Sequence, residues 1–177
     1  MLQLCYSYSM SSGKTHDQVT WALTPVVWLI STWGFHLPLA TGGIITLGHL
    51  IGGLLLSPDL DTRSRPFYRW GMFRFIWRPY QWVAKHRSGL SHGILLASWL
   101  RLLYLSAVLT LIYCITYLVL AQWSHIKAHS PGQDVLAFLS ANLPTLLWLG
   151  VGIWVGCLLH IMLDALSSAW PTKGKRR

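Results

Sequence analysis

The chain has 177 residues, which is the usual length of one domain. Apolar residues make up 53% of it, charged residues only 11%, and there are 11 tryptophans, which is more apolar surface than a water-soluble domain of this size could bury. This composition excludes a disordered chain and predicts an integral membrane protein. The three cysteines are odd in number and far apart, which also excludes a disulfide scaffold.

The charge is strongly one-sided. Fourteen Lys and Arg stand against five acidic residues, giving a formal net charge of +9. All the acids are aspartates, and most of them flank an apolar segment. Carboxylates close to lipid are costly and are usually kept for function, so the positions of the Asp and His residues are the ones to follow.

Four apolar stretches follow one another along the chain, at residues 22–35, 41–56, 93–123 and 135–163. The first two are short and interrupted by Gly or Pro, whereas the last two are longer than a bilayer requires. We therefore expect an all-α fold: one polytopic membrane helical bundle of about four transmembrane helices, with residues 1–177 forming a single membrane metal-binding domain.

The basic residues predict the orientation of this bundle. They concentrate in the loop 57–91 and in the tail 171–177. Under the positive-inside rule both segments are cytoplasmic, and an even number of spans returns both termini to that side. We expect a multi-pass protein of a bacterial-type inner membrane or a related membrane. The polar opening 6–18 argues against a signal peptide.

Aromatic and basic side chains alternate at helical spacing inside the loop 57–91. The aromatic positions are Phe67, Trp70, Phe73 and Trp77, and the basic ones are Arg69, Arg74 and Arg78. This pattern predicts an interfacial amphipathic helix that rests on anionic headgroups, in preference to substrate binding. We expect no nucleic-acid partner, because the aromatic residues accompanying these arginines lie beside lipid.

Histidines and aspartates from distant parts of the chain fall on the same, basic side of this topology. The histidines are His16, His86, His92 and His160, and the aspartates are Asp17, Asp59, Asp61 and Asp164. Imidazole and carboxylate together form the ligand set of zinc, manganese or iron. The sequence therefore predicts a divalent metal site, most simply a zinc site, at the cytoplasmic end of the bundle.

Two loop motifs contribute to this prediction. In the first, Pro58 ends the second apolar stretch and Asp59 and Asp61 follow two residues apart, a pair that could bridge metals or form ion pairs with the surrounding arginines. In the second, His86 and His92 flank a glycine that lets the loop fold both rings toward one point. The alternative for this motif is a basic turn facing headgroups.

The remaining histidines are more ambiguous. His160 and Asp164 are four residues apart on a helix, so they share a face and could either ligate one ion or bond to each other. His49 lies between Gly48 and Gly52, where a buried histidine bonded to a neighbour is as reasonable as a ligand. His36, His125 and His129 are not expected to be ligands. We expect Arg101 to snorkel to the interface or to meet an anionic substrate.

These motifs together resemble the YdjM-like membrane-bound metal-dependent hydrolases and related uncharacterised metal-binding membrane proteins. The resemblance is carried by Ser12-Gly13-Lys14-Thr15-His16-Asp17, Ser57-Pro58-Asp59-Leu60-Asp61, His86 to His92 and His160 to Asp164. It implies a metal site formed by His16, Asp59, Asp61, His86, His92, His160 and Asp164, with His49 and Asp17 as additional candidates. Thr62 occupies a position where many YdjM-like members have His.

The function expected from this pattern is metal-dependent hydrolysis of an ester or phosphoester at the cytoplasmic membrane surface. Asp59 and Asp61 would take part in the chemistry, and Arg87 would steady an anionic group such as a lipid phosphate. The alternative is a non-catalytic accessory or assembly protein, stabilised by its metal, that docks a membrane protein partner. Metal transport has no support, because no ladder of polar residues crosses the apolar stretches.

Overall fold

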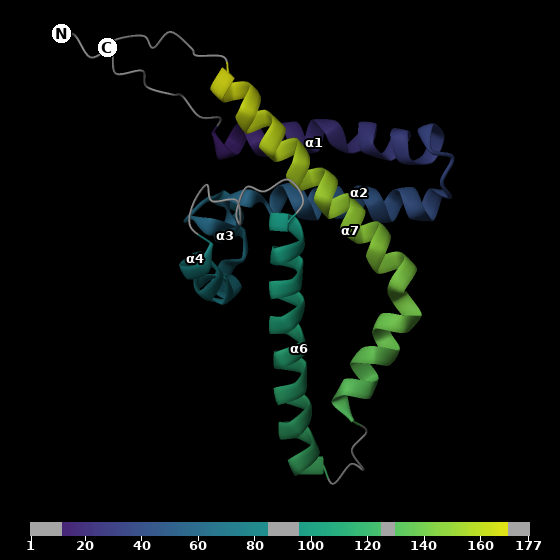
Figure 1. The fold of residues 1–177 in the computed structure, drawn as a ribbon, viewed down its shortest axis with the longest axis vertical. Coiled ribbons are helices and arrows are strands. Elements are labelled where there is room, and N and C mark those ends of the chain that lie inside the picture. The colour runs from purple at the N-terminus through teal and green to yellow at the C-terminus, as the bar shows by residue number, and fades with distance from the viewer. Residues whose placement is uncertain (1–11, 85–95, 125–129, 170–177) are drawn as a thin grey trace, which may run out of the picture.

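The structure is a computed structural model that describes residues 12–84, 96–124 and 130–169, and this part of the chain is helical and contains no strand (Figure 1). The expected all-α fold is confirmed at this level. The chain starts with α1 (Gly13–Leu29), which continues into a π-helical turn, η1 (Ile30–Gly34), and then α2 (Leu39–Leu54). Figure 1 shows α1 and α2 side by side and antiparallel.

The longest helix, α7 (Pro131–Ala169), packs against α2 through glycines. A Cβ atom at Gly52 would lie 2.2 Å from the carbonyl oxygen of Ile153, and one at Gly156 would lie 2.3 Å from that of His49. Gly48 and Gly152 are equally closed off by backbone atoms of the opposite helix. Only hydrogen fits at these positions, so the small-residue spacing of both helices is what allows their backbones to approach.

The helix α6 (Leu96–Ser124) differs from this packed region. It runs beside the first part of α7 but across the direction of α1 and α2. Leu102 and Leu105 pack against the core, but many of its other leucines are exposed, Leu111 to 60%. Figure 1 shows that α7 changes direction along its length, and Pro144 inside the helix accounts for a bend because it removes a backbone hydrogen bond.

Within the described residues, three helices are long and apolar enough to cross a membrane: Leu39–Asp61, Ala97–Gln122 and Pro131–Ala169. They correspond to the second, third and fourth of the expected stretches. The first, 22–35, is also helical, in α1 and η1, but it is not among the three.

The part of the basic loop up to Ala84 forms a small lobe of four short helices beside the end of α2 (Figure 1). They are η2 (Pro58–Asp61), α3 (Arg65–Arg69), η3 (Gly71–Trp77) and α4 (Arg78–Val83). The expectation of one continuous amphipathic helix is thus corrected. Gly71 has a φ of 53°, which ends the helical path of α3, so Phe67 lies before the break and Phe73 and Trp77 lie after it. Phe67 and Trp77 are buried, whereas Phe73 is exposed.

The lobe encloses most of the hydrophobic core, in which Leu60 and Trp77 are fully buried and Tyr80 nearly so. Arg101 of α6 is also fully buried, with its Nη2 donating to Ser98 Oγ and Cys157 Sγ, so the expected snorkelling of this side chain is wrong. Burial raises the pKa of Tyr80, and the nearby Arg101 guanidinium partly opposes that rise.

Candidate metal centre

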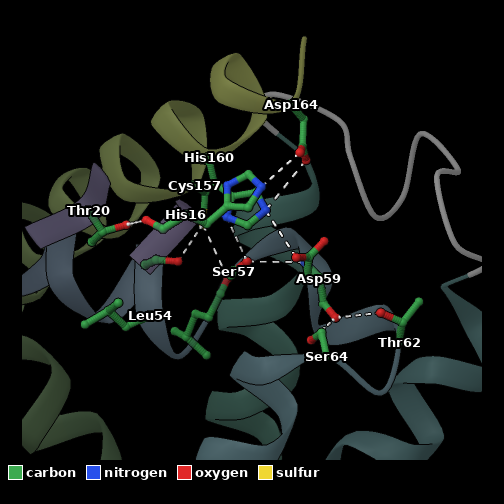
Figure 2. Close-up of polar contacts among 12 residues, drawn as sticks. His16, Thr20, Leu54, Ser57, Asp59, Thr62, Ser64, Cys157, His160 and Asp164 are labelled. Atoms are coloured by element: carbon green, nitrogen blue, oxygen red, sulfur yellow. Dashed lines mark hydrogen bonds and ion pairs between the residues drawn. The ribbon is translucent and has the colours of Figure 1, made fainter. Parts of the chain in front are cut away.

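Three elements bring polar side chains together where α1 begins, α2 ends and α7 nears its C-terminus (Figure 2). The first element is α1. Ser12 caps its N-terminus by accepting a hydrogen bond from the backbone N–H of Thr15 at 3.3 Å, which fixes His16 in the first turn. His16 is 4% exposed, and its backbone carbonyl accepts a bond from Thr20 Oγ1.

The second element is the η2 turn, which follows Pro58. The hydroxyl of Ser57 accepts a hydrogen bond from the backbone N–H of Asp59 at 3.3 Å and so caps this turn. The backbone carbonyl of Asp59 accepts bonds from the hydroxyls of Ser64, at 2.6 Å, and Thr62, at 3.2 Å. These local bonds hold the Asp59 carboxylate at the edge of the site.

The third element is α7, where His160 and Asp164 lie one turn apart on the same face. His160 Nδ1 lies 3.2 Å from Ser57 Oγ, so its Nε2 points in the opposite direction, toward the two carboxylates. That Nε2 is 3.4 Å from an oxygen of Asp59 and 3.6 Å from one of Asp164. His16 Nε2 is 3.0 Å from the other oxygen of Asp164.

The two imidazole rings are stacked, with centroids 3.7 Å apart and planes 15° from parallel. Both rings are buried, whereas the carboxylates of Asp164 and Asp59 are 20% and 22% exposed. The site is therefore closed on its imidazole side and open on its carboxylate side. A small molecule or ion can reach it from the open side.

The donor set fits a divalent transition metal. His16, His160 and Asp164 each offer a ligand atom, and these atoms all lie within 4.8 Å of one another. Two ligand atoms bonded to one zinc ion at about 2.1 Å in tetrahedral geometry lie about 3.4 Å apart, which is close to the 3.0 Å and 3.6 Å that separate Asp164 oxygens from His16 Nε2 and His160 Nε2. The buried His160 Nε2 makes no hydrogen bond that would compete with a metal.

The other predicted site residues are placed differently. His49 is fully buried, and its Nε2 lies 3.1 Å from the backbone carbonyl of Thr20, so it joins α2 to α1 and is outside the metal group. Asp61 is buried near Tyr80, whose pKa its charge helps to raise, and it is not one of the three grouped donors. Asp17 forms ion pairs with Arg65 and Arg69. Thr62 donates its hydroxyl hydrogen bond to the backbone carbonyl of Asp59 and so stabilises the η2 turn.

Three of the predicted residues, His86, His92 and Arg87, lie outside the residues that the structure describes, and their roles remain predictions. The sequence analysis missed the role of Ser57. A Ser-Pro pair directly before two acids is the signal of a capped turn, but its bond to a histidine more than 100 residues away is visible only after folding.

Comparisons with known proteins agree with this chemistry. The family model described as "Uncharacterized metal-binding protein (DUF2227)" matches residues 11–173, and the chain belongs to this family. An uncharacterized protein of Aquifex aeolicus (strain VF5) is 33% identical over 125 residues, which cover 69% of this chain and 88% of that protein. No solved structure matches the chain. Metal binding therefore has the support of the family description and of the His and Asp group.

Proposed function

We propose that this member of a metal-binding family holds a zinc ion on His16, His160 and Asp164 and uses it to hydrolyse a phosphoester at a membrane surface, with Asp59 as the general base. Two histidines and one carboxylate are a ligand set that catalytic zinc sites use, because three protein ligands leave a fourth position for water or substrate. Asp59 stands next to that set, on its exposed side.

The observation that carries this proposal is the orientation of His160. Ser57 holds Nδ1 and leaves Nε2 facing Asp59 and Asp164. Histidines that bind metals are usually held in this way, with one ring nitrogen fixed by a hydrogen bond and the other free to ligate.

Zinc, when bound, lowers the pKa of a coordinated water to about 7 and polarises the phosphoryl oxygen. The protein residues supply the rest. His16, His160 and Asp164 would hold the ion, with the Asp164 carboxylate neutralising part of its charge. Asp59 would take up the proton of the attacking water and return it to the oxygen of the leaving alcohol as the phosphoester bond breaks. Asp61 is buried, and its contribution to the chemistry stays a prediction.

The position of the substrate follows from the helices that flank the site. Three helices are long and apolar enough to span a bilayer, and the metal group lies at the end of two of them. The arginines of the lobe and the basic tail support a cytoplasmic location for this end and for both termini. A phosphate-bearing lipid is the substrate that reaches such a site without leaving the membrane.

The test is a metal count and an activity assay on the same preparations of detergent-purified full-length protein. We expect wild type to contain about one zinc per chain, His160→Ala to contain none, and Asp59→Asn to retain zinc. Cleavage of short-chain phosphatidic acid and of a chromogenic phosphodiester should fall about 100-fold or more in Asp59→Asn. His36→Asn, an exposed histidine in a turn, is the matched control and should change neither reading.

One observation favours a second function, a structural metal clamp. The ligands come from α1 and α7, elements at opposite ends of the chain, so an ion between them would fasten α1 to the rest of the fold. In that case chelation lowers the melting temperature strongly and no substrate is cleaved. Zinc binding with no hydrolysis in either assay would contradict the hydrolase function and support the structural clamp. A wild-type protein that is metal-free but fully stable would contradict both functions.

A further inference from the structure

A second polar cavity lies in the lobe, apart from the residues of the metal group. It has a volume of about 430 Å³ and is lined by Arg63, Phe67, Tyr68, Arg74, Arg78, Gln81 and Trp82. This volume is within the usual range for small-ligand sites. We propose that this cavity binds the phosphate-bearing headgroup of an anionic membrane lipid, and that it does so independently of the metal centre.

The charge of the cavity is not neutralised by the protein. Arg65 and Arg69, which belong to the same lobe, are both ion-paired with Asp17, at 2.8 Å and 2.5 Å. The three arginines of the cavity, in contrast, meet no carboxylate within the residues that the structure describes. Three guanidinium groups around one cavity leave a local positive charge that favours the binding of an anion.

The arginines are held in position by the lobe. Arg63 follows the η2 turn, Arg74 lies in η3 with its guanidinium 5.4 Å from the centre of the Tyr68 ring, and Arg78 begins α4. Gln81 Nε2 donates to the carbonyl oxygens of Leu60 and Thr62, which fixes the wall between α4 and η2. Guanidinium groups suit a phosphate because their paired N–H donors match two of its oxygens.

The surroundings of the cavity favour a lipid over a soluble phosphate. Met72, Phe73 and Trp82 are 81%, 60% and 80% exposed on the same lobe. Large apolar and aromatic side chains at the surface, mixed with arginines, are typical of segments that enter the headgroup layer. The lobe also lies beside the start of α6, which is long and apolar enough to span a bilayer (Figure 1). The cavity would therefore open into the headgroup layer.

The test measures binding of soluble short-chain lipids to full-length protein in a nonionic detergent by titration calorimetry. In the His160→Ala background, which removes binding that depends on zinc, dihexanoyl phosphatidic acid should bind at one site, and dihexanoyl phosphatidylcholine and inorganic phosphate should bind at least about ten-fold more weakly. The variants Arg63→Gln, Arg74→Gln and Arg78→Gln should each weaken the binding of phosphatidic acid by about ten-fold. Melting temperatures and the zinc content of these variants should match wild type, since all three side chains are exposed.

A charge control removes three positive charges from the tail at once, as Lys173→Gln, Lys175→Gln and Arg176→Gln combined, which is more charge than any single cavity variant removes. This control should leave the affinity for phosphatidic acid unchanged. Equal losses in the tail control and in the cavity variants would show diffuse attraction and overturn the proposal. If inorganic phosphate bound as tightly as phosphatidic acid, the ligand would be a soluble anion and the lipid proposal would be wrong. If phosphatidylcholine bound as tightly as phosphatidic acid, the cavity would not recognise anions.

Discussion

The two longest helices, α6 and α7, have the same mean hydropathy of 2.1 in their most apolar windows, but their surroundings are opposite. None of the α6 window is buried inside the protein, whereas 33% of the α7 window is, and the buried residues of α7 all lie between Gly150 and His160. Small residues let this part of α7 approach α2 closely, and the branched side chains of α6 do not. Equal hydropathy can therefore belong to a helix whose apolar side chains stay exposed or to one that packs against another helix and builds a site.

The largest expected effect compares the lobe core with the surface of α6. Leu60 is fully buried, so Leu60→Ala should lower the free energy of unfolding by about 2 to 5 kcal/mol through lost contacts and a cavity. Leu111 is 60% exposed, so Leu111→Ala should change it by less than about 0.5 kcal/mol. Thermal unfolding in detergent measures both. Similar losses in the two variants would mean that α6 is packed as tightly as the lobe.

A second comparison concerns two glycines of α2. A Cβ atom at Gly52 meets the backbone of α7, so Gly52→Ala should destabilise the protein by about 1 to 3 kcal/mol. Gly43 has no atom within 4 Å of the same position, so Gly43→Ala should leave stability unchanged or raise it, because Ala favours the helix. Both changes are read from melting temperatures. Equal tolerance at both positions would exclude the close α2 and α7 crossing.

Removal of the Ser57 hydroxyl should weaken metal binding without changing any ligand. Ser57→Ala should reduce zinc affinity about 10-fold to 100-fold, because His160 loses the partner that orients its ring. Ser31→Ala, which removes a buried hydroxyl that bonds only within its own helix, is the control and should keep full affinity. Competition with a fluorescent zinc chelator measures both. An unchanged zinc affinity in Ser57→Ala would show that this serine does not orient His160 for metal binding.

The smallest effect is a pH dependence in the lobe core. The pKa of Tyr80 is raised above its ordinary value of 10.0 by burial, so the folded state keeps this proton longer than the unfolded state. The stability that depends on the neutral phenol is therefore complete below about pH 10 and is lost as the pH rises above it. Tyr80→Phe should reduce the fall in melting temperature between about pH 9 and pH 11. An equal fall in both proteins would show that other groups cause it.

Much of the fold was predictable because it depends on local patterns. The apolar stretches predict the helices, and the spacing of Gly48 with Gly52 and of Gly152 with Gly156 predicts close packing. The lobe was less predictable. Helical spacing of its aromatic residues predicts one helix, but the positive φ of Gly71 divides the segment. Phe67 and Trp77 are buried in the core, whereas Phe73 is exposed.

The candidate site shows the same division. The sequence predicted His16, Asp59, His160 and Asp164 as candidate ligands, because imidazole and carboxylate together form a ligand set of transition metals, and the structure brings these four side chains together. Which of the predicted ligands meet was not readable. His49 bonds to a backbone carbonyl and Asp61 turns into the lobe core, although their sequence contexts resemble those of the residues that do converge.

The sequence alone determined the residue types, the helical periods and the positive charge, because these depend only on neighbours along the chain. The tertiary structure decided that a serine after α2 orients a histidine of α7, that Arg101 is buried, and that three arginines of the lobe share one cavity. These pairings join residues that are distant in sequence. They form only when the glycine faces of α2 and α7 close on each other and the lobe folds against them.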